Sequence, residues 1–306
     1  MIRFVRTHVT RWVSALAAGA VVLALAAPAG AQVFAFSKEE LTEFTAQNPF
    51  DRFPDGRPRI PDNLLERARG LSMEEVLMIS GKGFRNQYVD GWKLVQPGKK
   101  MVGRAFTVLF MPSRPDVDQV ANARGKAKGF QPYNNQTMID MLGPNDVVVV
   151  DLFGKKDGGT FVGDNLFYYI MRATKGAGMV IEGSVRDLQG IADMDMPAYI
   201  RDVHPSAIGN VVLAGWNIPV RIGGATVMPG DLVLGDQEGI YFIPPSLVTE
   251  VLDRADETHI HDEWTRKKFD EGKYKSTDIY GSPRAPELKK EYQEYLERRL
   301  KEIRGK

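Results

Sequence analysis

An arginine and an aspartate stand side by side in the run Gly183-Ser184-Val185-Arg186-Asp187. The guanidinium of Arg186 can bind a substrate carboxylate through two parallel hydrogen bonds. The carboxylate of Asp187 can hold a hard divalent cation such as Mg²⁺, directly or through water. Together the two charges predict a site that binds a 2-oxo acid and stabilises an enolate, whereas an isolated Arg–Asp pair favours a surface ion pair at a strand end.

The neighbouring sequence predicts the elements that position this pair. The apolar run Met179–Ile181 is typical of a buried strand, and we expect that strand to end in a glycine turn at Gly183. Gly163-Asp164-Asn165 is expected to open a helix over about residues 165–175, with Asp164 as its N-cap. The free N–H groups and the dipole at such a helix start favour an anion. His204, expected on a loop, could also line the site.

Strands alternate with helices through the middle of the chain. The run Val147–Asp151 is continuous and β-branched, which suits a strand covered on both faces. Further strands are expected at 102–110, 198–202, 210–213, 219–222, 232–235 and 239–243, and helices at 38–45, 71–81, 119–125, 135–142, 187–192, 246–272 and 287–304. This order predicts an α/β fold with a mixed sandwich.

The first 31 residues have the composition of a secretory signal peptide. A basic start contains Arg3, Arg6 and Arg11, and the apolar stretch Val13–Ala27 follows it. The small-x-small cleavage pattern Ala29-Gly30-Ala31 comes next. The apolar stretch is short for a membrane span, so we favour a cleaved signal over a membrane anchor. We therefore expect a periplasmic or secreted protein that begins near Gln32 and needs no membrane after cleavage.

Composition excludes several classes of function. The chain has 40 basic and 39 acidic residues, so it gives no electrostatic reason to expect a nucleic-acid partner. It has no cysteine, which excludes a thiolate nucleophile and thiolate metal ligands. No G-x-S-x-G motif indicates a serine hydrolase. The strand regions offer no obvious lysine for a Schiff base, which favours metal-dependent enolate chemistry.

Four segments match, in order, the pattern of one known family. They are Pro97-Gly98 with Val102–Val108; Gly163–Leu166; Gly183–Asp187; and Pro229–Val233 with Asp236–Gly239 and Ile243-Pro244. Over about residues 70–270 the chain resembles the superfamily of class II 4-hydroxy-4-methyl-2-oxoglutarate aldolases and RraA-like proteins. The resemblance implies an αββα sandwich and a homotrimer, or a homohexamer made from trimers, with sites at the subunit interfaces.

The resemblance also implies roles for residues of this chain. A divalent metal, Mg²⁺ or Mn²⁺, would be held by Asp187, and Arg186 would bind the pyruvoyl carboxylate or carbonyl. The loop from Gly163 would bind the substrate, with the backbone amides of Asn165 and Leu166 on its carboxylate. Asp164 would orient a water and take part in proton transfer.

Two positions stay open in this comparison. Asp164 and Arg186 enclose twenty-one residues where the family's aldolases have twenty, so Asn165 could instead fill the family's aspartate position. The resemblance also implies a second acid, contributed by the helix expected at 246–272 of a neighbouring subunit. Asp262 or Glu263 falls at that place, and we take Glu263 as the catalytic candidate.

We therefore expect a divalent-metal-dependent lyase that cleaves a 2-oxo acid to pyruvate through a metal-stabilised enolate. Its substrate would resemble 4-hydroxy-4-methyl-2-oxoglutarate, cleaved by a retro-aldol step, or would be oxaloacetate, which would be decarboxylated. One alternative is a non-catalytic RraA-like binding or regulatory protein, although the expected signal peptide argues against a cytoplasmic ribonuclease as partner. Another is a lyase or hydrolase for a different exported substrate, such as a sugar acid.

The expected organisation has four parts. Residues 1–31 form the signal peptide and 32–70 an N-terminal arm, broken by prolines at 49, 54, 58 and 61. Residues 71–272 form the RraA-like aldolase domain. Residues 273–306 form a charged helical tail.

Overall fold

The computed structural model describes residues 35–77 and 83–305. The expected signal peptide, and the end of the helix expected at 71–81, therefore lie outside the described residues. Within the two described ranges, no helix is long and apolar enough to cross a membrane.

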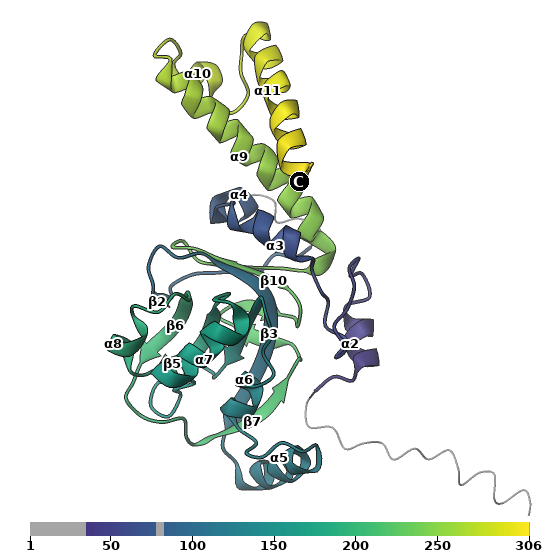
Figure 1. Ribbon diagram of the computed structural model, residues 1–306, viewed down its shortest axis with the longest axis vertical. Helices are drawn as coiled ribbons and strands as arrows, with labels where there is room; N and C mark the ends of the chain where they lie inside the picture. Colours follow the sequence, from purple (N-terminus) through teal and green to yellow (C-terminus); the bar gives the residue numbers. More distant parts are fainter. Residues whose placement is uncertain (1–34, 78–82, 306) are drawn as a thin grey trace, which may run out of the picture. The chain divides into compact units, whose positions relative to one another are not determined.

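Helices and strands alternate in the middle of the chain, and helices lie at both ends of its described part (Figure 1). The helices are α2 (Lys38–Phe44), α3 (Asp62–Arg69), α4 (Met73–Leu77), α5 (Pro115–Ala127), α6 (Asn135–Ile139), α7 (Asp164–Thr174), α8 (Leu188–Ile191), the 3-10 helix η1 (Pro245–Leu247), α9 (Val248–Asp270), α10 (Ser276–Ile279) and α11 (Pro286–Arg304). The strands are β1 (Tyr88–Val89), β2 (Lys93–Leu94), β3 (Met101–Pro112), β4 (Asp146–Asp151), β5 (Met179–Val185), β6 (Ala198–Val203), β7 (Val211–Trp216), β8 (Val220–Ile222), β9 (Ala225–Val227), β10 (Leu232–Gly235) and β11 (Ile240–Ile243).

One large mixed sheet organises the fold. Its strand order is β1-β11-β10-β3-β4-β5-β6-β2, and β7 also pairs with β3, with a register shift between Leu109 and Phe110. The four central strands β3, β4, β5 and β6 are parallel. The outer strands β10, β11 and β2 pair antiparallel to their neighbours. The predicted mixed α/β fold is confirmed.

The two faces of β4 show why the sheet is covered on both sides. Val148 and Val150 belong to a core cluster with Phe167 and Ile170 of α7. Val147 and Val149 belong to a second cluster, to which the β8–β9 hairpin contributes. Because successive side chains of a strand point to opposite faces, a continuous valine run needs apolar partners on both.

The N-terminal segment is anchored in the fold more firmly than its proline-rich composition indicates. A helix that we did not predict, α3, buries Leu65 and Ala68 in a cluster shared with β10, β11 and α9. Arg57 forms a buried ion pair of 2.9 Å with Asp146 at the start of β4. The predicted boundary at residue 70 stays a prediction.

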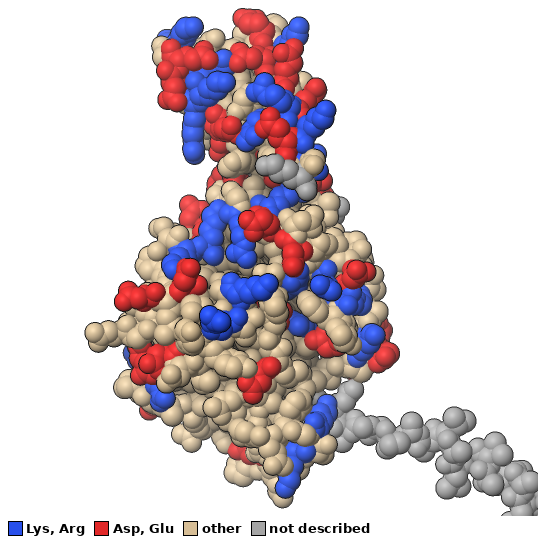
Figure 2. All heavy atoms as spheres, in the orientation of Figure 1, with Lys and Arg blue, Asp and Glu red and all other residues tan. Residues whose placement is uncertain are grey.

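The C-terminal helices pack on one another. Trp264 of α9, Ile279 of α10 and Leu288 of α11 form a small core of their own. Around this core the surface carries acidic and basic side chains in close alternation (Figure 2). The predicted helices at 246–272 and 287–304 are confirmed.

Two local predictions were wrong, and some short elements were not predicted. The strand β5 does not turn at Gly183 but continues to Val185. Gly183 is needed because a β-carbon there would lie 2.9 Å from the carbonyl oxygen of Gly159 and from a side-chain atom of Leu152. The N-cap of α7 is Gly163, and Asp164 is the first helical residue. The short strand β9 was not predicted.

Candidate functional site

The candidate site lies where the parallel strands end. Because β3 to β6 run in the same direction, their carboxyl ends meet at one edge of the sheet. Arg186 and Asp187 directly follow β5, Asp151 ends β4, and His204 directly follows β6. Open α/β sheets bind ligands outside this edge.

The segment before α7 is held against the end of β5. The N–H of Phe161 donates to the carbonyl of Ser184 (3.0 Å), and the N–H of Arg186 donates to the carbonyl of Val162 (3.1 Å). This pairing brings Gly163 against the Arg–Asp pair. A β-carbon at Gly163 would lie 2.2 Å from Oδ2 of Asp187 and 3.0 Å from Nε of Arg186, so only glycine permits this approach.

Asp187 connects the end of β5 with the start of α7. Its φ of 57° is left-handed, and its carbonyl accepts the N–H of Gly190 (2.8 Å) at the start of α8. Its Oδ2 lies 3.3 Å from Nε of Arg186 and 3.4 Å from the N–H nitrogen of Asp164 at the start of α7. The side chains of Arg186 and Asp187 are 41 % and 45 % exposed, so both charges are open to a ligand.

The start of α7 supplies the remaining predicted residues. Asp164 lies against α8, because a β-carbon on Gly190 would be 3.1 Å from Cβ of Asp164. Its Oδ1 accepts the N–H of Asn165 (2.7 Å), so that amide already has a partner inside the chain. Leu166 packs against the core below α7. The structure therefore brings Gly163, Asp164, Arg186 and Asp187 together, with Asn165 exposed beside them.

The carboxylates of Asp187 and Asp164 are ligands that fit a weakly held hard cation. Across the described residues there is no group of three His, Cys, Asp or Glu side chains that could hold a metal ion. Mg²⁺ commonly binds through one or two carboxylates and keeps several waters. Asp187 with Asp164 as its neighbour matches that smaller set, and both carry oxygen ligands of the kind that Mg²⁺ or Mn²⁺ prefers.

Glu263 lies elsewhere within the chain. It lines a cleft of about 580 Å³ between α4 and α9, together with Glu74, His259 and Asp262. Partial burial acts to raise its pKa, but hydrogen bonds from Tyr295 (2.6 Å) and Arg299 outweigh this and lower the pKa. Glu263 and Asp262 do not meet Arg186 in one chain, and a contribution from a neighbouring subunit stays a prediction.

Two further residues lie at the same edge. The N–H of His204 donates to the carbonyl of Val185 (3.0 Å), which places its backbone beside Arg186. Its Nδ1 faces the hydroxyl of Ser206 at 2.9 Å. Asp151, which we did not predict as a site residue, is buried, and burial raises its pKa. The acid at the end of the valine run is the sequence signal that could have indicated it.

The fold and the site define a mixed α/β protein with an Arg–Asp pair at the carboxyl edge of its sheet. Residues 72–242 match the model of the RraA-like family, described as Aldolase/RraA. The chain therefore belongs to the RraA-like family.

Relatives and solved structures agree with this family. Protein DlpA of Legionella pneumophila is 28 % identical over 164 residues, which are 53 % of this chain and 24 % of DlpA. A Halalkalibacterium halodurans protein named "Putative 4-hydroxy-4-methyl-2-oxoglutarate aldolase" is 32 % identical over 121 residues, 39 % of this chain and 56 % of that protein. The crystal structure of Streptomyces coelicolor RraAS2, an unusual member of the RNase ES inhibitor RraA protein family, superposes with a TM-score of 0.59 and 27 % identity, covering 69 % of this chain and 100 % of RraAS2.

The matches cover only parts of the curated relatives. The chain spans about a quarter of DlpA and about half of the Halalkalibacterium protein.

Proposed function

We propose that this protein is a divalent-metal-dependent lyase that cleaves a 2-oxo acid to pyruvate. The observation that supports this most directly is the packing of Gly163 against Arg186 and Asp187, which sets a guanidinium, a carboxylate and the start of α7 around one point. The aldolase name of the Halalkalibacterium relative agrees with this class of reaction.

Each side chain has a part in the proposed reaction. Arg186 binds the carboxylate of the 2-oxo acid and orients its 2-oxo group, and its positive charge stabilises the enolate that carbon–carbon cleavage leaves. The start of α7 favours the same negative charge through the helix dipole. Asp164 holds a water and moves the proton that converts the enolate to pyruvate.

Asp187 would hold the cation, with Asp164 beside it. A bound Mg²⁺ or Mn²⁺ would act as a Lewis acid on the 2-oxo oxygen. We take 4-hydroxy-4-methyl-2-oxoglutarate-like compounds and oxaloacetate as the first substrates to test, because cleavage of either leaves the same enolate.

We also propose that the protein is exported and assembles as a homotrimer or homohexamer, with Glu263 of one subunit reaching the site of another. Sequencing the N-terminus of protein from the periplasmic fraction tests the cleavage near Gln32. Light scattering of the purified protein tests the assembly.

The deciding experiment is pyruvate release by the purified mature protein. Oxaloacetate and 4-hydroxy-4-methyl-2-oxoglutarate are each supplied with Mg²⁺ or Mn²⁺, and then with EDTA. We expect release above the background rate with metal and its loss with EDTA. A folded oligomer that is inactive on both compounds would instead support the binding-protein alternative, which the likeness to RraAS2 favours.

A further inference from the structure

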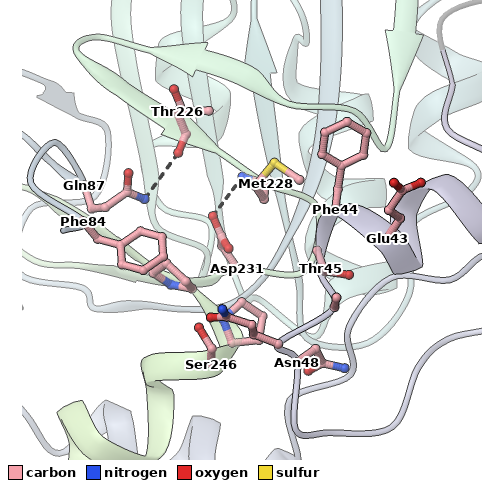
Figure 3. Close-up of a pocket in the computed structure, with 14 residues that line it drawn as sticks. Glu43, Phe44, Thr45, Asn48, Phe84, Gln87, Thr226, Met228, Asp231 and Ser246 are labelled. Carbon is pink, nitrogen blue, oxygen red and sulfur yellow. Dashed lines mark hydrogen bonds between the residues drawn. The ribbon is translucent and has the colours of Figure 1, made fainter. Parts of the chain in front are cut away.

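A cavity of about 520 Å³ lies between the end of α2 and the β10–β11 side of the sheet (Figure 3). Four segments that are separate in the sequence form it. Its described lining is Glu43–Asn48, Phe84, Gln87, Thr226, Met228, Asp231 and Pro244–Ser246. Arg186 and Asp187 are not among these residues, and the proposed lyase reaction uses none of them.

Strand registers show that this cavity is separate from the Arg186 site. The carbonyl of Asp231 accepts the N–H of Ala105, and Ala105 pairs with Val147. Val148 pairs with Met179 at the start of β5. Arg186 is seven residues further along that strand, so the two sites are about 25 Å apart along the strand direction.

Asp231 is the chemically unusual group of the cavity. It is only 1 % exposed, yet it carries a carboxyl group, and its one ordered partner is the N–H of Met228, which donates to Oδ2 (2.8 Å). Among the described residues, Oδ1 has no hydrogen-bond donor. Burial raises the pKa of Asp231 to about 7. A buried carboxyl with a free oxygen favours a ligand that supplies a donor or a positive charge.

The cavity walls select further for a cation. Phe44 and Phe84 are 62 % and 38 % exposed, and they lie on either side of Asp231 in Figure 3. Aromatic faces attract cations and also pack against apolar groups. Glu43 adds a second carboxylate, and the described lining contains no Lys, Arg or His. An anionic ligand would therefore meet two carboxyl groups and, among the described lining residues, no positive charge.

Other polar groups of the lining are already engaged. The side-chain amide of Gln87 donates to the carbonyls of Thr226 (3.3 Å) and Phe242 (3.1 Å). The side-chain amide of Asn48 donates to the carbonyl of Phe50 (2.7 Å). Among the described lining residues, Asp231 is the buried carboxyl group that keeps an oxygen for a ligand.

We propose that this cavity binds a small organic cation in which a primary ammonium group is attached to an apolar body. The ammonium group donates to Oδ1 of Asp231, and the apolar body lies between Phe44 and Phe84. The hydrogen bond is charge-assisted, and the low dielectric around a buried carboxylate strengthens it. This site is independent of the proposed lyase activity, so either can fail without the other.

Benzylamine is the probe, with benzyl alcohol and benzoate as its neutral and anionic counterparts. Each is titrated into the full mature protein at pH 8, by calorimetry and by the methyl resonance of Met228 in protein labelled at its methionine methyl groups. We expect saturable 1:1 binding of benzylamine that shifts the Met228 resonance. We expect the two counterparts to bind at least about tenfold more weakly, because they lose the charge-assisted hydrogen bond.

Matched variants locate the binding. Asp231→Asn keeps an oxygen acceptor for the N–H of Met228 but removes the charge, and we expect it to weaken benzylamine binding by about tenfold or more. Phe44→Ala should weaken it several-fold, whereas Phe269→Ala, which removes an exposed phenyl ring from α9, should leave it unchanged. Absence of saturable binding, equal binding of benzoate, or unaltered affinity in Asp231→Asn would each overturn the proposal.

Discussion

Asp187 and Asp231 carry the same functional group in opposite surroundings. Asp187 is half-exposed, faces the guanidinium of Arg186 and lies against the start of a helix. Asp231 is buried, has one backbone N–H as its partner, and has its pKa raised to about 7 by burial. The difference teaches that the surroundings, rather than the residue type, assign an acid its chemistry. Asp187 suits a cation at an exposed edge of the sheet, while Asp231 suits a cation at the buried wall of a cavity.

The largest expected effect is on turnover at the Arg186–Asp187 site. Arg186→Ala removes the charge that binds the substrate and stabilises the enolate, and we expect kcat/KM for pyruvate release to fall about 10²–10³-fold. Arg172→Ala, on the exposed last turn of α7, is the matched control and should retain full activity. An Arg186→Ala enzyme as fast as the unaltered protein would remove Arg186 from the reaction.

The packing at Gly163 gives the next test. Gly163→Ala forces a β-carbon into the position of Asp187 Oδ2, so the Arg–Asp pair must move. Displacement of reacting groups by about 1 Å can cost about 10²-fold in rate, and overpacking costs about 1–3 kcal/mol of unfolding free energy.

Gly224→Ala is the control for this variant, because no atom lies within 4 Å of a β-carbon built there. Turnover and urea denaturation are measured for both. If Gly163→Ala kept its turnover, the close approach of the loop would not matter for the chemistry.

The sequence predicts the Arg186–Asp187 site better than the Asp231 cavity, for physical reasons. Valine runs fix where β4 and β5 lie, and a parallel pairing then brings Gly163 and Arg186 to the same edge. Local sequence could not show that Gly183 serves a close contact instead of a turn, because Leu152 and Gly159 reach it only in the folded chain. Local sequence likewise gives no sign that Asp231 is buried. Its burial depends on segments near residues 45 and 245, which no local pattern connects.

The pH dependence of stability tests whether the carboxyl group of Asp231 is buried in the folded protein. The pKa of Asp231 is raised from 3.8 to about 7, so between these values the folded state holds a proton that the unfolded state releases. Unfolding free energy therefore falls as the pH rises from about 4 to about 7. We expect the unfolding free energy of the unaltered protein to fall between pH 5 and pH 8. This fall should exceed that of the Asp231→Asn variant by about 2–3 kcal/mol.

Urea denaturation of both proteins at the two pH values measures this difference, and the variant serves as the control for all other titrating groups. Parallel pH profiles would show that Asp231 is solvated in the folded state, and the comparison with Asp187 would lose its basis.

The smallest expected effect concerns Glu263, which is intermediate between the two aspartates because it is partly exposed and hydrogen-bonded. Tyr295→Phe removes the hydroxyl that donates to Glu263. We expect the unfolding free energy at pH 7 to fall by about 0.5 kcal/mol. The effect is small because solvent screens a carboxylate as exposed as Glu263. Hydrogen bonds lower the pKa of Glu263 below its ordinary value of 4.5, so this contribution is present above pH 4.5 and is lost as the pH falls further.

A double-mutant cycle with Glu263→Gln isolates the pair, because a carboxylate gains more from the hydroxyl than a neutral amide does. Urea denaturation should show a coupling between the two substitutions at pH 7 that shrinks at pH 4. A coupling of the same size at both pH values would mean that the charge of Glu263 has no part in holding α11 against α9. The hydroxyl of Tyr295 would then hold Glu263 equally well in its ionised and its protonated form.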